Sequence, residues 1–287
     1  MSRIGDFGWR GAADETGVGR VVSAHGDYYH LVCNEVGGEI LARKKKSVFK
    51  FHKLEDRNQK PDTRNADQVN PMTGDFVRFR YNPHGESLIT EVVPRYSWFV
   101  RKDPTARRKA QTLAVNFDTL FVMMSLNENF STARLERYLT LAEDMGEAQA
   151  VVVLTKRDLV GDSELARQAI ALAEEAGRPV LPISSLTGEG LAALEPYLGV
   201  RRTVAFIGSS GVGKSTLLNT LAGEEWQATQ EIQEWSGKGR HTTTSRELVM
   251  LPSGTMIIDT PGIREIGIVG ESEEMLVKGE STHRYRK

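Results

Sequence analysis

Gly208-Ser-Ser-Gly-Val-Gly-Lys-Ser215 is the stretch that decides the fold of this chain. It matches the pattern G-x-x-x-x-G-K-[ST], and it stands between a strand-like apolar run at 203–207 and an apolar segment at 215–221 that we interpret as a helix. In that context the glycines let backbone N–H groups turn inward, and the N-terminus of the helix adds partial positive charge. The stretch therefore predicts a loop that surrounds the phosphates of a nucleoside triphosphate.

Side chains in and beyond this loop have predicted roles. We expect the Lys214 ammonium to reach the β- and γ-phosphate oxygens and to assist catalysis, and the Ser215 hydroxyl to ligate Mg²⁺. Another apolar strand ends in Asp259-Thr-Pro-Gly262, where Asp259 can hold the Mg²⁺ shell through water and the Gly262 amide can bond the γ-phosphate. The residues predicted to bind the triphosphate are Gly208, Ser209, Ser210, Gly211, Val212, Gly213, Lys214, Ser215, Thr216, Asp259 and Gly262.

Two further loops indicate which base is bound. Thr155-Lys-Arg-Asp158 follows a buried strand and resembles the guanine-recognition motif N-K-x-D, with Thr in place of Asn. The Asp158 carboxylate can accept hydrogen bonds from guanine N1–H and the 2-amino group, which adenine does not offer, while the Lys156 stem lies along the base. A loop at 184–190 also ends a strand and resembles the second guanine loop of GTPases. The predicted guanine-site residues are Thr155, Lys156, Arg157, Asp158, Ser184, Ser185 and Leu186.

The rest of residues 116–270 alternates between strand and helix patterns. Continuous apolar runs at 117–124, 150–154 and 179–183 suit strands buried on both faces, and apolar spacing at 132–145 and 163–176 predicts helices. This alternation predicts an α/β domain with a doubly wound parallel sheet, whose ligand loops lie at the carboxyl ends of the strands.

The N-terminal part of the chain has a different pattern of apolar and polar residues. Residues 17–95 contain five short runs that alternate apolar with polar residues, at 19–25, 28–33, 39–43, 74–81 and 87–93. Short antiparallel strands in this number suit a small all-β barrel of the OB type. We interpret 1–16 as a mobile arm or a short cap, 96–115 as a basic, exposed linker between domains, and 271–287 as a tail.

Composition limits the class of protein. No stretch approaches the roughly 20 apolar residues that span a bilayer, and the first ten residues have no apolar core like that of a secretory signal. The single cysteine, Cys33, allows no intrachain disulfide and no thiol cluster for a metal. We expect a cytoplasmic protein that does not contact membranes.

Charge is divided unevenly between the two halves. Residues 1–110 carry 20 Lys and Arg against 14 Asp and Glu, whereas 111–287 carry 17 against 24. A basic front half suggests contact with a polyanion, although chance segregation of solvated charge gives the same count. The basic residues predicted to contact RNA are Arg43, Lys44, Lys45, Lys46, Lys50 and Lys53, with Tyr28, Tyr29, Phe49 and Phe51 nearby in sequence. Such interleaving suits backbone tracking and base stacking, but the same aromatics could form the barrel core.

The order of the motifs is unusual, because the guanine loops at 155–158 and 184–185 precede the phosphate loop at 208 instead of following it. This order, Gly239-Arg-His-Thr-Thr-Thr244 and Asp259-Thr-Pro-Gly-Ile-Arg264 together resemble the ribosome small-subunit-dependent GTPase A family of bacteria. The resemblance implies an OB-fold RNA-binding domain, a circularly permuted GTPase domain that binds GTP or GDP with Mg²⁺, and a C-terminal zinc domain. It also implies that the partners are the small ribosomal subunit and its rRNA, late in subunit maturation, and that the subunit stimulates hydrolysis.

The catalytic assignment departs from the common GTPase pattern. Ile263 occupies the position of the usual water-orienting Gln and cannot hydrogen-bond. His241, which matches the family's histidine, is our candidate to orient the water, and Thr243 is our candidate to cap Mg²⁺ and the γ-phosphate. The alternatives are that His241 is an ordinary surface residue and that Arg240 serves catalysis or contacts RNA.

Three expectations complete the prediction. Residues 271–287 contain His283 and no cysteine, so we assign no zinc ligands although the family implies zinc. We expect a monomer. The competing functions are an ATPase or kinase that uses the same phosphate loop beside an RNA-binding barrel, and an RNA-binding module with a vestigial nucleotide site.

Overall fold

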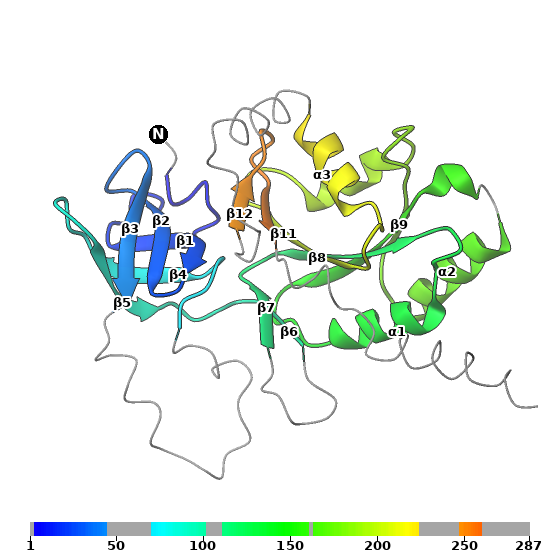
Figure 1. Cartoon of the computed structure of the whole chain (residues 1–287), viewed down its shortest axis with the longest axis horizontal. Helices are drawn as coiled ribbons and strands as arrows, with labels where there is room; N and C mark the ends of the chain where they lie inside the picture. The colour runs from blue at the N-terminus through cyan, green and yellow to red at the C-terminus, as the bar shows by residue number, and fades with distance from the viewer. Residues whose placement is uncertain (1–2, 45–69, 102–110, 161–162, 224–246, 260–287) are drawn as a thin grey trace, which may run out of the picture.

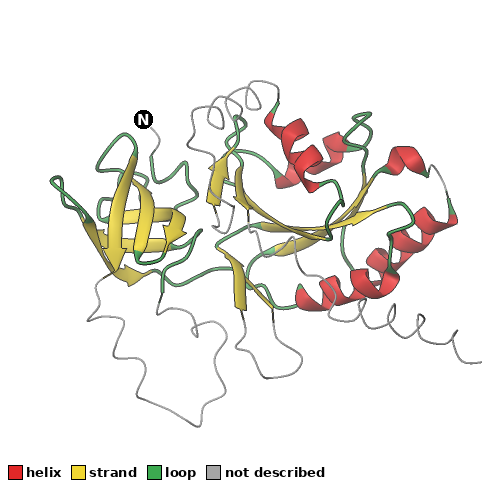
Figure 2. Ribbon diagram, in the orientation of Figure 1, coloured by secondary structure: helices red, strands yellow, loops and turns green. Residues whose placement is uncertain are grey.

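The computed structural model describes residues 3–44, 70–101, 111–160, 163–223 and 247–259. A β-barrel and an α/β domain lie beside each other, as Figures 1 and 2 show. The barrel strands are β1 (Val18–His25), β2 (Tyr28–Cys33), β3 (Glu39–Lys44), β4 (Phe76–Arg80) and β5 (Ser87–Val92). In space their order is β1-β2-β3-β5-β4, and β4 pairs back with β1, so that the sheet closes. The predicted five-stranded barrel of the OB type is therefore confirmed.

The barrel is closed around alternate residues of its strands. Val21, Tyr29, Leu31, Phe79 and Ile89 point inward and are almost completely buried. Because successive side chains of a strand point to opposite faces, the residues between them lie outside. The β3–β5 pair is parallel, whereas the other barrel pairs are antiparallel.

The segments that flank the barrel are packed. Ile4 is fully buried and Phe7 is 9% exposed, both within the core shared with the α/β domain, so residues 3–16 form a cap over that core. Residues 96–115, predicted as an exposed linker, instead contain two paired strands and a buried side chain. There β6 (Trp98–Arg101) and β7 (Gln111–Val115) pair as a two-stranded antiparallel sheet, and Phe99 is fully buried. The many Arg and Lys residues between the two strands concealed this short apolar pairing from sequence analysis.

The α/β domain is doubly wound, as predicted. Its strands are β8 (Thr119–Ser125), β9 (Gln149–Thr155), β10 (Val180–Pro182), β11 (Thr203–Gly208), β12 (Glu247–Met250) and β13 (Met256–Asp259). Helices α1 (Thr132–Leu141) and α2 (Glu164–Glu175) pack on one face, while α3 (Lys214–Ala222) and the 3-10 helix Leu191–Tyr197 pack on the other (Figure 1). The residues of β8 alternate between the two cores, which explains its continuous apolar sequence.

The order of the strands determines where a ligand can bind. Across the sheet it is β10-β9-β8-β11-β13-β12, and all neighbouring pairs except β13–β12 are parallel. The chain moves outward from β8 to β10 and then returns to place β11 on the other side of β8. In sheets of this kind a crevice forms at the carboxyl ends of the two strands where the direction of winding reverses. That crevice lies between the ends of β8 and β11.

The barrel is joined to the α/β sheet by backbone pairing and by a buried arginine. Strand β1 pairs with β12 at Ser23 and Glu247, so the strands of both domains form one sheet. Arg20 of β1 is completely buried, and its guanidinium donates hydrogen bonds to the carbonyl of Asn116 at 2.7 Å and to the hydroxyl of Thr203 at 3.0 Å. Desolvation by this burial lowers the pKa of Arg20. One side chain thus holds the barrel against the starts of β8 and β11.

A buried ion pair lies at the same junction. The carboxylate of Asp75 accepts two hydrogen bonds of 2.8 Å from Arg95, and the two side chains are 0% and 4% exposed. The side-chain amide of Asn116 donates to the carbonyl of Gly74 at 3.1 Å. A side chain at Gly74 would lie 2.6 Å from the Val115 carbonyl, so glycine is what permits this close approach.

None of the described helices is long and apolar enough to cross a bilayer.

Candidate nucleotide site

The phosphate loop lies at the crevice that the strand order predicts. Gly208 is the last residue of β11, where it lies opposite Met123 of β8. A Cβ atom on Gly208 would approach the Met123 carbonyl to 2.9 Å, so only glycine fits there. Gly211 and Gly213 have φ values of 73° and 98°, a region that side chains disfavour. The three glycines therefore produce the tight turn that leads into α3.

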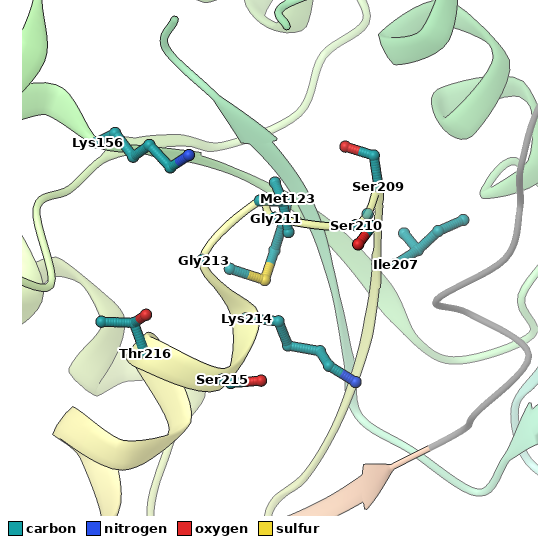
Figure 3. Close-up of a pocket in the computed structure, with 12 residues that line it drawn as sticks. Met123, Lys156, Ile207, Ser209, Ser210, Gly211, Gly213, Lys214, Ser215 and Thr216 are labelled. Atoms are coloured by element: carbon teal, nitrogen blue, oxygen red, sulfur yellow. The ribbon is translucent and has the colours of Figure 1, made fainter. Parts of the chain in front are cut away.

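This turn encloses a cavity of about 510 Å³. It is lined by residues 208–216 and by Met123, Lys156 and Ile207, most of which are labelled in Figure 3. Lys214 is the first residue of α3, and Ser215 and Thr216 are exposed in its first turn. Free N–H groups at the start of a helix, together with a lysine, provide a binding site for anionic phosphate groups.

The predicted base-recognition residues meet at the end of the neighbouring strands. Lys156 follows β9 with a φ of 61°, which turns the chain sharply and brings Lys156 to the cavity. The hydroxyl of Ser184 is buried; it donates to the Asp158 carboxylate at 2.6 Å and accepts from the Thr187 N–H at 3.2 Å. Asp158 itself is exposed, so one carboxylate oxygen is held by the protein while the group faces solvent.

Further contacts hold the two base loops together. The Arg157 N–H donates to the Ile183 carbonyl at 3.1 Å, and the Arg157 guanidinium pairs with Glu189 at 2.8 Å. The Thr220 hydroxyl of α3 donates to the Thr216 carbonyl at 2.9 Å and lies 3.4 Å from the Ser185 carbonyl, and Leu186 is 83% exposed. Thus the loop at 184–190 is bonded to the loop at 155–158 and lies beside the helix that follows the phosphate loop.

Thr155 connects the base loop with the phosphate loop. Its side chain is 2% exposed, and its hydroxyl donates to the carbonyl of Val212 at 2.6 Å. The structure therefore brings together the predicted residues at 155–158, 184–186 and 208–216. All of them lie at the carboxyl end of the sheet, although more than 20 residues of sequence separate each of the three segments from the next.

The residues present suit Mg²⁺ bound together with a nucleotide. The Ser215 hydroxyl is exposed beside the cavity, and Asp259 is the last residue of β13, the strand parallel to β11. Within the described ranges, no three His, Cys, Asp or Glu side chains come together in a group that could hold a metal by themselves. Mg²⁺ commonly takes one or two protein oxygens and completes its shell with substrate phosphates and water, so this sparse donor set fits it.

Several predicted site residues lie outside the described residues. These are His241, Thr243, Gly262, Lys45, Lys46, Lys50 and Lys53, together with Arg240 and the tail in which zinc ligands were sought. Of the basic residues predicted to contact RNA, Arg43 and Lys44 are described. Arg43 lies 5.5 Å from the ring centroid of Tyr28, which is 42% exposed, and Lys44 pairs with Asp27 at 3.4 Å. Tyr29 instead belongs to the barrel core.

Sequence analysis did not identify Met123 and Ile207 as lining residues. Both belong to continuous apolar strands, in which composition does not show the residue that borders a loop. The missing information is the register between β8 and β11, which pairs Met123 with Gly208.

Comparison with known proteins adds independent evidence. Residues 92–269 match the family model described as RsgA GTPase. The chain is 42% identical over 252 residues to the small ribosomal subunit biogenesis GTPase RsgA 2 of Lactiplantibacillus plantarum, a match that covers 88% of this chain and 66% of that protein. It is 38% identical over 258 residues to the small ribosomal subunit biogenesis GTPase RsgA of Leptospira interrogans, covering 89% and 66%. The chain thus spans 66% of the length of these relatives.

Solved structures share the fold. The crystal structure of YjeQ from Thermotoga maritima superposes with a TM-score of 0.60 at 25% identity and covers 88% of this chain and 77% of that one. The structure of YloQ, described as a circularly permuted GTPase, gives a TM-score of 0.55 at 23% identity and covers 88% of this chain and 74% of that one. The fold of this chain therefore occurs in known proteins.

Proposed function

This chain belongs to the RsgA GTPase family, and from that membership and the geometry of the site we propose that it binds GTP and hydrolyses it to GDP and phosphate during maturation of the small ribosomal subunit. The observation that carries the proposal is the convergence of two kinds of loop on one end of the sheet. The phosphate loop follows β11, and the Ser184–Asp158 pair, which suits guanine, lies at the ends of β10 and β9.

Different residues of the site bind the phosphates, the base and the metal ion. Backbone N–H groups of 208–215 and the Lys214 ammonium hold the phosphates, and they stabilise negative charge that develops on them during hydrolysis. Asp158 accepts the two guanine donors, while Ser184 keeps its carboxylate in place. Ser215, with Asp259 acting through water, would hold Mg²⁺, which would neutralise charge on the phosphates.

Activation of the attacking water is assigned to the segment that precedes β12. His241 orients the water, because Ile263 occupies the position of the usual glutamine and cannot hydrogen-bond. Thr243 caps the γ-phosphate, and the Gly262 amide donates a hydrogen bond to the γ-phosphate. An arginine finger is not part of this assignment, so unstimulated turnover is slow, on the order of minutes per event.

We assign contact with the small ribosomal subunit to the barrel. Arg43, Lys44 and the basic residues at 45, 46, 50 and 53 contact rRNA, and the exposed ring of Tyr28 beside Arg43 offers a surface for base stacking. The factor acts as a monomer in the cytoplasm, where small subunits mature.

The test is the rate of phosphate release from GTP with and without purified small subunits. We expect stimulation by the subunits and loss of activity in Lys214→Ala, which removes the phosphate-binding ammonium. Tight binding of ATP with little binding of GTP would favour the ATPase or kinase alternative. Undiminished ribosome-dependent release by Lys214→Ala would favour a vestigial nucleotide site.

A second variant tests the catalytic assignment. His241→Ala is expected to bind GTP with unchanged affinity and to lose most of the stimulated turnover. Unchanged turnover would remove His241 from its role and leave Arg240 as the candidate to examine.

A further inference from the structure

The loop at 184–190 contains a compact turn that is closed on itself. The Ser184 N–H donates to the Glu189 carbonyl at 2.9 Å, and the Gly188 N–H donates to the Ser184 carbonyl at 2.9 Å. The Thr187 N–H donates to the Ser184 hydroxyl at 3.2 Å. Because these bonds join the two ends of the turn, it forms one unit.

Two side-chain bonds hold this turn against the segment that follows β9. The Ser184 hydroxyl donates to Asp158 at 2.6 Å, and the Arg157 guanidinium pairs with Glu189 at 2.8 Å. Ser184 and Glu189 stand at opposite ends of the turn. A turn held at one end can pivot about that bond, whereas a turn held at both ends cannot. The Arg157–Glu189 ion pair therefore supplies the second fixed point.

The Glu189 end needs such a restraint because glycines flank it. Gly188 and Gly190 have φ values of 83° and 76°, and glycine adopts either sign of φ with little difference in energy. A Cβ atom on Gly190 would lie 2.3 Å from the Pro182 carbonyl, whereas a Cβ on Gly188 would meet open space. The backbone is thus packed on one side of Glu189 and free to rearrange on the other, so the Glu189 side chain helps to fix this end.

The Arg157 end of the ion pair is itself held in place. The Arg157 N–H donates to the Ile183 carbonyl at 3.1 Å, and its side chain is 24% exposed. Lys156, just before it, has a φ of 61°, a conformation that residues with side chains adopt rarely and only where their surroundings hold it. Because Lys156 lines the cavity (Figure 3), the bonds of Arg157 also keep this lysine at the nucleotide site.

We propose that Arg157 is a positioning residue, whose ion pair with Glu189 keeps the loop at 184–190 closed on the base and slows the release of a guanine nucleotide. This rests on the proposed function in that the ligand is a guanine nucleotide. Asp158 contacts the base, whereas Arg157 acts through the loop. The two side chains of the ion pair are 24% and 55% exposed, so the effect is modest and is screened by salt.

The experiment measures the release of fluorescently labelled GDP after addition of excess unlabelled GDP. Arg157→Ala and Glu189→Ala should each release GDP about two- to fivefold faster than the wild type, the range for a partly exposed ion pair. The double variant should match the single variants, because the second substitution removes an interaction that is already lost. At roughly 1 M salt the wild type should approach the variants, since screening limits the reach of charges to about 3 Å.

A matched control comes from an ion pair of similar length in the same domain. Arg167 and Glu164 of α2 lie 2.9 Å apart and are more exposed. Arg167→Ala should leave the release of GDP unchanged. Thermal unfolding without nucleotide shows which variants fold. Glu189→Gln removes the charge with the smallest change in shape, and it replaces Glu189→Ala if the alanine variant does not fold.

A second probe tests whether the effect acts at the base. IDP lacks the 2-amino group that Asp158 recognises, so the wild type should release IDP faster than GDP. In Arg157→Ala the loosened loop aligns Asp158 less well, and the difference between GDP and IDP should narrow. An unchanged difference would contradict closure of the loop on the base.

Other outcomes also decide the matter. Release of GDP at the wild-type rate by both single variants would overturn the proposal. So would effects that multiply in the double variant, or equally fast release by Arg167→Ala. If the wild type releases ADP as slowly as GDP, the assignment of GTP fails. The same double-mutant cycle with labelled ADP then decides the role of the ion pair, because the pair holds the loop whichever base is bound.

Discussion

Replacement of Arg95 by methionine is expected to weaken the junction between barrel and α/β domain severely. The variant keeps much of the apolar stem but removes both hydrogen bonds to Asp75, whose carboxylate is completely buried. The carboxylate keeps the Met72 N–H at 2.9 Å and the amide of Asn116 at 3.5 Å, neither of which carries a charge. A buried charge that loses its partner costs about 3–5 kcal/mol of unfolding free energy.

A double-mutant cycle separates the pair from the loss of packing. We expect Asp75→Asn to cost about 2–3 kcal/mol, because the guanidinium loses its anionic partner but keeps an amide oxygen. The double variant removes both charges, so it should be more stable than the sum of the two losses predicts, with a coupling of about 2 kcal/mol.

The assay is urea unfolding followed by tryptophan fluorescence, since Trp9 packs on Phe76 of the barrel and the Trp98 ring lies against Gly146, which precedes β9 of the α/β domain. GDP affinity serves as the control. β8 has seven residues and spans roughly 20 Å, so the ion pair near its start lies far from the phosphate loop at its end. A loss below about 1 kcal/mol in Arg95→Met, or strictly additive losses in the cycle, would refute this reasoning.

Three other predictions follow from single residues. Asp158→Asn replaces one acceptor of the carboxylate by a donor, so GDP affinity should fall by at least about 100-fold. Xanthosine diphosphate, which has a 2-oxo group, should bind this variant better than GDP does in a competition assay. Equal loss of affinity for both nucleotides would contradict the assignment of Asp158 to the guanine base. Gly208→Ala places a Cβ 2.9 Å from the Met123 carbonyl, and calorimetry should show a loss of about 1–3 kcal/mol together with weaker GDP binding. Burial raises the pKa of the Cys33 thiol to about 11, so it should react with a disulfide reagent at pH 8 only after unfolding. Because the pKa of Cys33 in the folded protein lies above the ordinary thiol value of 9.0, the stability from this group is complete below pH 9.0 and is lost as pH rises toward 11. Rapid labelling of the native protein at pH 8 would contradict the burial of this thiol.

The nucleotide loops could be predicted because their chemistry is local. The loop at 208–215 needs glycines with positive φ, a lysine and a hydroxyl in a fixed order, so the sequence alone was sufficient to place it. The barrel was also predictable, since its alternating pattern follows directly from burial on one face.

Contacts between distant segments could not be predicted. Arg20 lies on an amphipathic strand, where a basic residue is expected to face solvent, and it is buried only because the starts of β8 and β11 provide acceptors. The hydrogen bond from Thr155 to Val212 depends on the register that brings the end of β9 beside the phosphate loop. Sequence analysis did not predict β12 for a related reason. Its four residues pair with β13 and β1, but they are too few to show a clear alternation of apolar and polar residues. Each of these features depends on the order of strands in space.

The order of strands also has a consequence for synthesis. β8 and β9 leave the ribosome early, yet one edge of β8 stays open until β11 arrives, after residues 126–202 have been made. At roughly 5–20 residues per second, an apolar strand edge is exposed for about 4–15 seconds. Unpaired edges of this kind invite association with other chains. The permuted connection therefore makes the nascent α/β domain dependent on its last strands, and a chain stalled near residue 200 should be a substrate for chaperones that bind extended apolar segments.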